Sequence, residues 1–155
     1  MRVHAFESEI WLPQPRREVF EFFSDAGNLE RITPPWVHFR VLTPQPIEMR
    51  PGALIDYRLR LRGLPLGWRT LISEWEPPVR FVDLQLRGPY RLWHHTHAFE
   101  ERDGGTLCAD RVLYAVPFDR LVHERLVRPD VERIFAHRRQ ALAALFGAPE
   151  TASAS

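Results

Sequence analysis

The chain has 155 residues and a formal charge of +1, from 21 basic and 20 acidic side chains. This length suits one domain with a substantial core. The near balance of charge provides no field that would recruit nucleic acid, so we expect no nucleic-acid partner. The single cysteine, Cys108, excludes an internal disulfide and a cysteine zinc site.

The sequence contains no apolar run long enough to cross a bilayer, and its start, MRVHAFESEI, lacks the apolar centre of a signal peptide. We therefore expect a cytoplasmic protein without membrane insertion. Residues 1–147 are predicted to form one ligand-binding domain. The small and polar residues 148–155 are predicted to be a disordered tail.

The first part of the chain predicts a strand followed by two short helices. Residues 2–12 alternate between two side-chain sets, which indicates a long strand. Pro15 suits the first turn of a helix, which we expect over residues 16–24. A second short helix is expected over residues 28–32, and Pro34 ends it.

Six further strands are predicted in the middle of the chain, because turns rich in glycine and proline separate short apolar or alternating segments. Consecutive antiparallel strands accumulate twist, so we expect the sheet to curl strongly. The six strands are expected at about residues 37–42, 53–62, 66–75, 80–86, 92–101 and 106–116.

Residues 119–146 form the longest helix candidate, with apolar residues at helical spacing. Pro129 predicts a kink or a break, with the continuous helix beginning near it. Arg138 falls on the apolar stripe. The expected fold is α+β: a seven-stranded curved antiparallel sheet wrapped around a long C-terminal helix, with two short helices between the first two strands.

The most informative pattern lies in the predicted strand 92–101, where one face combines bulky aromatic and titratable side chains. A sheet face of this kind is either the wall of a cavity or a costly core. The side chains on this face are Trp93, His95, His97 and Phe99.

A hairpin register extends this pattern to the next strand. Asp103-Gly104 is a strong two-residue turn signal, and it pairs Arg102 with Gly105. His97 then lies opposite Asp110, within contact range.

The turn before this strand leaves two alternatives. With an odd-numbered loop, Asp83 and Gln85 share the face of the imidazoles. With an even-numbered loop, Val82, Leu84 and Leu86 take that place. If Asp83 faces inward, the three apolar side chains face outward, and they predict a possible homodimer contact.

Several segments together resemble a known superfamily. They are Pro15–Asp25, Asn28-Leu29 with Ile32–Pro35, Trp68 with Ile72 and Trp75, Pro77-Pro78, Phe81–Asp83 with Gln85, Gly88–Tyr90, then Trp93, His95, His97 and Phe99, and finally Gly105-Thr106 and Asp110. Across residues 3–146 the chain resembles the START/SRPBCC, or helix-grip, superfamily, and within it a bacterial polyketide cyclase/dehydrase-like ligand-binding subgroup. The resemblance implies the helix-grip fold and ligand binding. It implies no catalytic residue, since members of the superfamily range from lipid carriers to aromatases and cochaperones.

A curved sheet closed by one helix leaves a hollow unless large side chains fill it. We therefore predict that the protein binds or carries a small hydrophobic or aromatic molecule, lipid-like or polyketide-like, without a cofactor. The candidate ligand-binding residues are Tyr57, Trp68, Asp83, Gln85, Trp93, His95, His97, Asp110, Tyr114 and Arg138.

Other interpretations of the same residues stay open. A cyclase or dehydratase would use His95, His97 or Asp110 as acid and base. The same residues together with Arg138 are equally consistent with a structural ion network. They offer three potential metal ligands, but nothing in their spacing demands a metal, and we expect none. A protein-interaction or regulatory module is the remaining alternative.

Overall fold

The computed structural model describes residues 1–148. The predicted tail therefore lies outside the described residues, apart from Ala148. Seven antiparallel strands form one curved sheet in the order β1-β7-β6-β5-β4-β3-β2. The strands are β1 (His4–Leu12), β2 (Arg40–Val41), β3 (Leu54–Leu61), β4 (Leu64–Glu76), β5 (Arg80–Arg87), β6 (Leu92–Arg102) and β7 (Gly105–Ala115).

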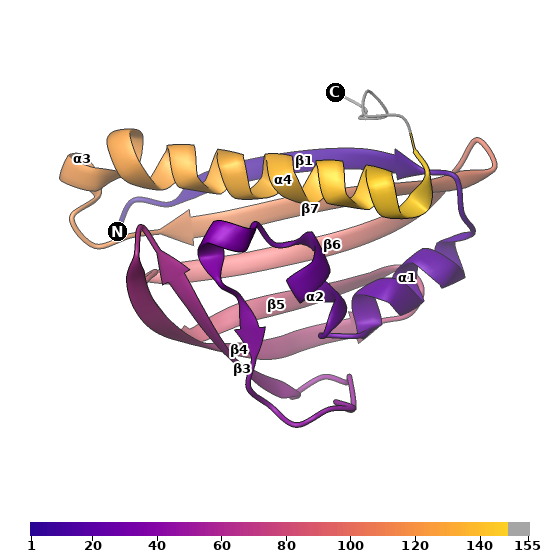
Figure 1. The fold of residues 1–155 in the computed structure, drawn as a ribbon, viewed down its shortest axis with the longest axis horizontal. Helices are drawn as coiled ribbons and strands as arrows, with labels where there is room; N and C mark the ends of the chain where they lie inside the picture. The colour runs from indigo at the N-terminus through magenta and orange to yellow at the C-terminus, as the bar shows by residue number, and fades with distance from the viewer. Residues whose placement is uncertain (149–155) are drawn as a thin grey trace.

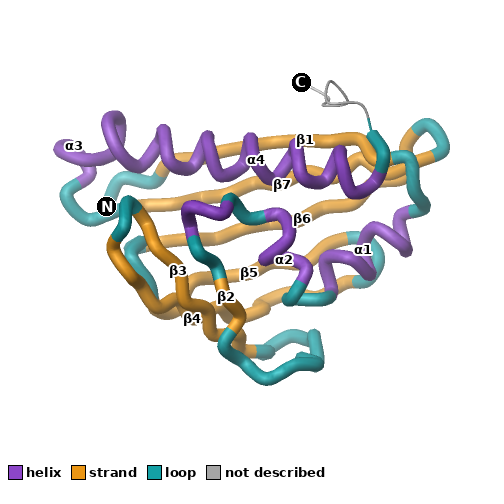
Figure 2. The backbone as a smooth tube through the Cα atoms, in the orientation of Figure 1, coloured by secondary structure: helices purple, strands orange, loops and turns teal. Residues whose placement is uncertain are grey.

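The helices all lie on one side of this sheet, with the long C-terminal helix running beside the strands (Figure 1; Figure 2). They are α1 (Arg16–Ser24), α2 (Asn28–Ile32), the 3₁₀ turn η1 (Pro35–Val37), α3 (Asp119–Val122), the π-helix η2 (His123–Val127) and α4 (Arg128–Phe146). None of these helices is both long and apolar enough to cross a membrane. The predicted helix-grip architecture is confirmed.

The C-terminal helix changes type at the position that the sequence indicated. The π-helix η2 separates the single turn α3 from α4, and Pro129 lies in the first turn of α4. Proline is tolerated there because the first backbone N–H groups of a helix have no partner inside it. The predicted start of the continuous helix near Pro129 is confirmed.

The predicted strand 37–42 is much shorter in the structure, where only Arg40–Val41 pair as β2. Two features shorten it. Pro35–Val37 form the 3₁₀ turn η1, and His38 has a left-handed backbone with a φ of 49°. A left-handed residue interrupts the extended conformation of a strand.

Aromatic side chains fill the space between α1 and the sheet. Phe20 of α1 packs edge to face on Phe81 and Phe99, with ring centroids 5.8 and 5.3 Å apart. Phe23 lies against Phe99 at 5.3 Å. Because these rings fill the space beneath α1, any cavity must lie under α4, away from α1.

The outward face of β5 differs from its prediction. Val82 is fully buried and Leu84 is half-buried, so only Leu86, 54% exposed, presents a large apolar surface. Val82 lies directly opposite Glu74, which forms an ion pair of 2.7 Å with Arg80, two residues from Val82 on the same strand. The predicted exposed apolar strand face is therefore wrong at Val82, and the homodimer stays a prediction.

Candidate ligand-binding site

The hairpin geometry brings the titratable side chains to one face of the sheet. In the β6–β7 pairing, Arg102 lies opposite Gly105 and His97 opposite Asp110, as the turn signal predicted. In the β5–β6 pairing, Asp83 lies opposite His95. Directly opposed residues share a face, so Asp83 faces inward with both imidazoles.

The hydrogen bonds between these groups run diagonally rather than straight across. His95 Nε2 is 2.7 Å from Asp110 Oδ1, and His97 Nε2 is 2.6 Å from Asp83 Oδ2. The predicted contact of His97 with Asp110 is looser, at 3.4 Å between Nδ1 and Oδ1. The two imidazole rings stack with centroids 3.7 Å apart. Each carboxylate is thus hydrogen-bonded to the imidazole that lies opposite the other carboxylate.

His97 is held as a neutral imidazole. Its Nε2 donates to Asp83, and its Nδ1 accepts from Arg138 Nη2 at 3.4 Å, which one neutral tautomer satisfies. Burial and the nearby His95 lower the pKa of His97 to about 4, against the opposing effect of Asp83. The ring also stacks on Phe81 with centroids 4.0 Å apart.

Arg138 turns into the network instead of extending to the edge of the helix. Its side chain is 11% exposed, and Nη2 lies 3.3 Å from Asp110 Oδ1. The guanidinium also lies 5.2 Å from the centre of the Phe23 ring. Burial would raise the pKa of the Asp110 carboxyl, but Arg138 and His95 together hold it well below its ordinary value.

Asp83 is ionised for a similar reason. Burial raises the pKa of its carboxyl, and the neighbouring His95 and the hydrogen bond from His97 more than offset that effect, so the pKa lies below its ordinary value. Two carboxylates therefore share one guanidinium within this buried group. Such charges are stable inside a protein only when they are paired and hydrogen-bonded.

A cavity of about 170 Å³ lies beside this group, between strands β3 to β6 and helix α4. Its walls are mainly apolar and aromatic. Its lining residues are Ile32, Thr33, Val37, Phe39, Tyr57, Leu59, Leu61, Trp68, Thr70, Asp83, Tyr90, Trp93, His95, Ile134, Phe135 and Arg138.

Most of the sequence-predicted ligand residues lie on this cavity. The lining includes Tyr57, Trp68, Asp83, Trp93, His95 and Arg138. His97 and Asp110 lie behind His95, in contact with it. Gln85 binds the backbone oxygen and nitrogen of Tyr90 at 2.6 and 3.0 Å, which fixes the β5–β6 turn. Tyr114 binds His123 instead, at 2.7 Å.

Other lining residues were not among the sequence-based candidates. Ile134 and Phe135 belong to the apolar stripe of the C-terminal helix, which the helical period of the sequence had marked as inward-facing. Thr33, Val37 and Phe39 come from the irregular segment around η1. A segment without a period gives no sequence signal for the direction of its side chains.

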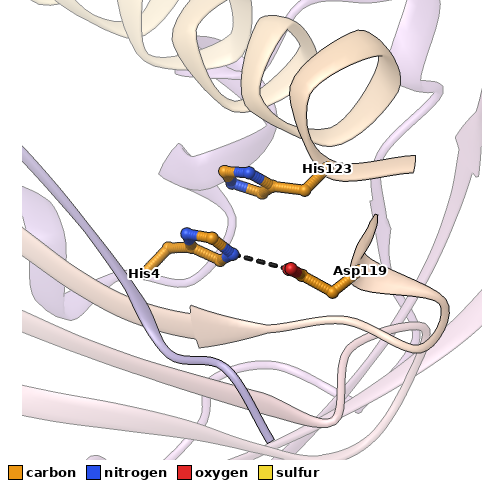
Figure 3. Close-up of side chains that lie close together, drawn as sticks. All are labelled: His4, Asp119 and His123. Carbon is orange, nitrogen blue, oxygen red and sulfur yellow. Dashed lines mark hydrogen bonds and ion pairs between the residues drawn. The ribbon is translucent and has the colours of Figure 1, made fainter. Parts of the chain in front are cut away.

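A second group of titratable side chains joins the start of β1 to the start of the C-terminal helix (Figure 3). His4 Nε2 lies 2.5 Å from Asp119 Oδ1. The His4 ring stacks on the His123 ring with centroids 3.4 Å apart and an angle of 6° between the planes. The hydroxyl of Tyr114 forms a hydrogen bond with Nε2 of His123. The alternation of residues 2–12 gave no reason to pair His4 with His123.

Within residues 1–148, two sets of side chains are close enough to hold a metal ion: His4 with Asp119 and His123, and Asp83 with His95 and His97. In the first set the rings are parallel, so their nitrogen lone pairs lie in parallel planes and do not converge on one point. In the second, the Nε2 atoms bind different carboxylates and a guanidinium lies 3.4 Å from His97. Both arrangements suit hydrogen bonding better than metal coordination.

Residues 12–143 match the family described as polyketide cyclase / dehydrase and lipid transport. The chain belongs to this family. This match confirms the resemblance to the SRPBCC superfamily, and no curated protein matches the chain.

Solved structures share the fold of this chain. Protein CV1439 from Chromobacterium violaceum has a TM-score of 0.73 at 16% identity, with 94% of this chain and 99% of that chain covered. The major latex-like protein 151 from Panax ginseng has a TM-score of 0.70 at 9% identity, covering 93% and 97%.

A third similar structure is a much longer protein. It is a nucleoside-diphosphate sugar epimerase from Corynebacterium glutamicum, with a TM-score of 0.64 and 27% identity. The match covers 90% of this chain and 28% of the epimerase. The fold of this chain thus corresponds to one part of that larger protein.

Proposed function

We propose that this polyketide cyclase/dehydrase family protein binds a small apolar molecule in the cavity between the sheet and α4. The observation that carries the proposal is the composition of the cavity wall. Aromatic and aliphatic side chains cover most of it, and ionised Asp83 lies with His95 and Arg138 on the same lining. Pockets of this kind bind ligands through apolar contact and orient them through a few polar groups.

Trp68 and Trp93 make the proposal directly testable, because both line the cavity. The purified protein is extracted with organic solvent to release any retained molecule, which mass spectrometry then identifies. Titration of the emptied protein with fluorescent fatty acids, polyphenols and simple aromatics should quench the fluorescence of these two tryptophans.

A matched pair of variants on α4 provides the control. Ile134→Phe adds bulk to a cavity-lining position, whereas Leu145→Phe adds the same ring at a position 41% exposed. We expect Ile134→Phe to weaken binding at least tenfold and Leu145→Phe to leave it unchanged. Equal affinity in both variants would place the binding site elsewhere.

A second candidate function is acid–base chemistry at His95. Nε2 of His95 binds Asp110 at 2.7 Å, which fixes the ring and leaves Nδ1, 3.7 Å from Asp83, for a ligand. A carboxylate that orients an imidazole in this way is common in general-base sites. Asp83 and Asp110 are ionised, so neither donates a proton. The imidazole of His95 would therefore act first as the base and then as the acid.

If His95 acts as this acid and base, the protein would be a dehydratase. His95 would remove the proton alpha to a carbonyl, and the imidazolium would return it to the departing hydroxyl, releasing water and forming a carbon–carbon double bond. Wild type would then dehydrate a β-hydroxy carbonyl compound. His95→Gln would bind the compound without turnover, and an equal rate in that variant would remove the enzymatic candidate.

A further inference from the structure

The cavity is small for a carrier of lipids or fused-ring polyketides. Its volume is about 170 Å³. Sites for drug-sized ligands occupy roughly 300–1,000 Å³. An apolar protein cavity of about 150 Å³ takes up benzene. The space therefore suits one aromatic ring.

The aromatic wall suits a flat guest. The rings of Trp68 and Trp93 lie edge to face, 5.4 Å apart at 88°. Tyr90 meets Trp68 at 5.6 Å and 61°. The wall thus offers both ring edges and ring faces, and a further ring gains edge-to-face contacts with either. Ile134 and Leu59 also line the cavity and add aliphatic surface.

The wall disfavours a charged guest of either sign, through its charges and through its largely apolar surface. A carboxylate would meet Asp83, and the nearest cation, Arg138, already binds Asp110 and His97. An ammonium group would be attracted to Asp83, but it would also meet Arg138 and would lose its hydration in a largely apolar space. An uncharged guest avoids both penalties.

A hydroxyl group on the guest would find an acceptor. Asp83 Oδ2 binds His97, yet a carboxylate can accept about four hydrogen bonds. Burial and the nearby Asp83 raise the pKa of the Tyr57 hydroxyl. Tyr57 therefore stays protonated and uncharged. We infer that the cavity binds an uncharged single-ring phenol whose hydroxyl donates to Asp83. This inference rests on the proposed function, because it names the ligand class of the same cavity.

Four single-ring compounds test the inference on the unmodified protein. They are p-cresol, toluene, 4-methylbenzoate and 4-methylbenzylamine, which share the tolyl ring and differ in the substituent para to its methyl group. Affinities at pH 7 come from calorimetry or from tryptophan quenching. We expect p-cresol to bind at least tenfold more tightly than each of the other three. In Asp83→Asn, the preference for p-cresol over toluene should fall below threefold, with the fold verified by circular dichroism.

The outcomes separate this inference from the proposed function. If 4-methylbenzoate or 4-methylbenzylamine binds more tightly than p-cresol, the inference is overturned and the proposed function stands. The same holds if oleate binds while no single-ring compound does. If p-cresol, oleate and a polyphenol such as quercetin all fail to bind the emptied protein, the proposed function itself falls.

Discussion

Asp83 lies opposite His95 in the sheet, yet its hydrogen bond of 2.6 Å goes to His97. The crossing links four side chains into one unit, because Asp110 in turn binds His95. Arg138 closes the unit from the helix side through Asp110. One wall of the cavity is therefore held by a network that joins three strands to α4.

Removal of Asp110 should destabilise the protein strongly. Asp110→Ala leaves the buried guanidinium of Arg138 without its carboxylate, and loss of one partner of a buried pair costs about 3–5 kcal/mol. Urea unfolding measures the change. The matched control is Glu7→Ala, which breaks the exposed pair of Glu7 with Arg111 and should cost under about 1 kcal/mol. Similar costs in both variants would show that the network does not stabilise the fold.

Acidification from pH 6.5 to pH 4 should destabilise the protein. Burial lowers the pKa of His97 to about 4, below the ordinary value of 6.5. Between these values the unfolded chain binds more protons than the folded one, so the free energy of unfolding decreases as pH falls from 6.5 to 4. The expected loss is roughly 3 kcal/mol.

A pair of histidine variants isolates this effect. In His97→Gln the free energy of unfolding should change less steeply between pH 6.5 and pH 4, because the titrating group is gone. His38→Asn replaces an exposed histidine with a residue that tolerates its left-handed backbone, and the wild-type slope should persist. An unchanged slope in His97→Gln would contradict the buried neutral imidazole.

The His4 group should hold the start of the C-terminal helix against β1. His4→Phe keeps a ring for stacking on His123 but loses the hydrogen bond to Asp119. Amide hydrogen exchange within α3 and η2 should become roughly tenfold faster, since a hydrogen bond to a charged group is lost. Exchange in α4 beyond Arg138 should stay the same. A uniform acceleration across the chain would instead indicate global destabilisation.

Two glycines in strands should respond oppositely to alanine. A Cβ at Gly105 would lie 2.3 Å from the backbone oxygen of Leu12 and 2.6 Å from the Trp11 ring, whereas at Gly67 nothing lies within 4 Å. Gly105→Ala should lower the free energy of unfolding by about 1–3 kcal/mol through overpacking. Gly67→Ala should be neutral or slightly stabilising. Equal stability of the two variants would contradict the close approach of β1 to Gly105.

The order and register of the elements were accessible from the sequence because they depend on local signals. The Asp103-Gly104 turn determines the β6–β7 pairing, and alternation along β6 places His95 and His97 on one face. Proline at position 129 marks the start of α4. Each of these signals acts over only a few residues.

The details of the site were not accessible in the same way. The crossed hydrogen bonds depend on side-chain rotamers, which the register does not determine. The stacking of His4 on His123 joins residues far apart in the chain. Val82 is buried between two neighbouring strands, where Glu74 and Thr96 lie opposite it. In all three cases the deciding contact is tertiary.

The most direct test of the cavity as a ligand site is nuclear magnetic resonance of the indole N–H groups of the five tryptophans during addition of p-cresol. Trp68 and Trp93 line the cavity, whereas Trp11 on β1 bonds to the backbone oxygen of Arg102. We predict saturable shifts of the Trp68 and Trp93 signals with Trp11 unmoved. Shifts confined to Trp11 or Trp36, or no saturable shift with any apolar compound, would contradict the account.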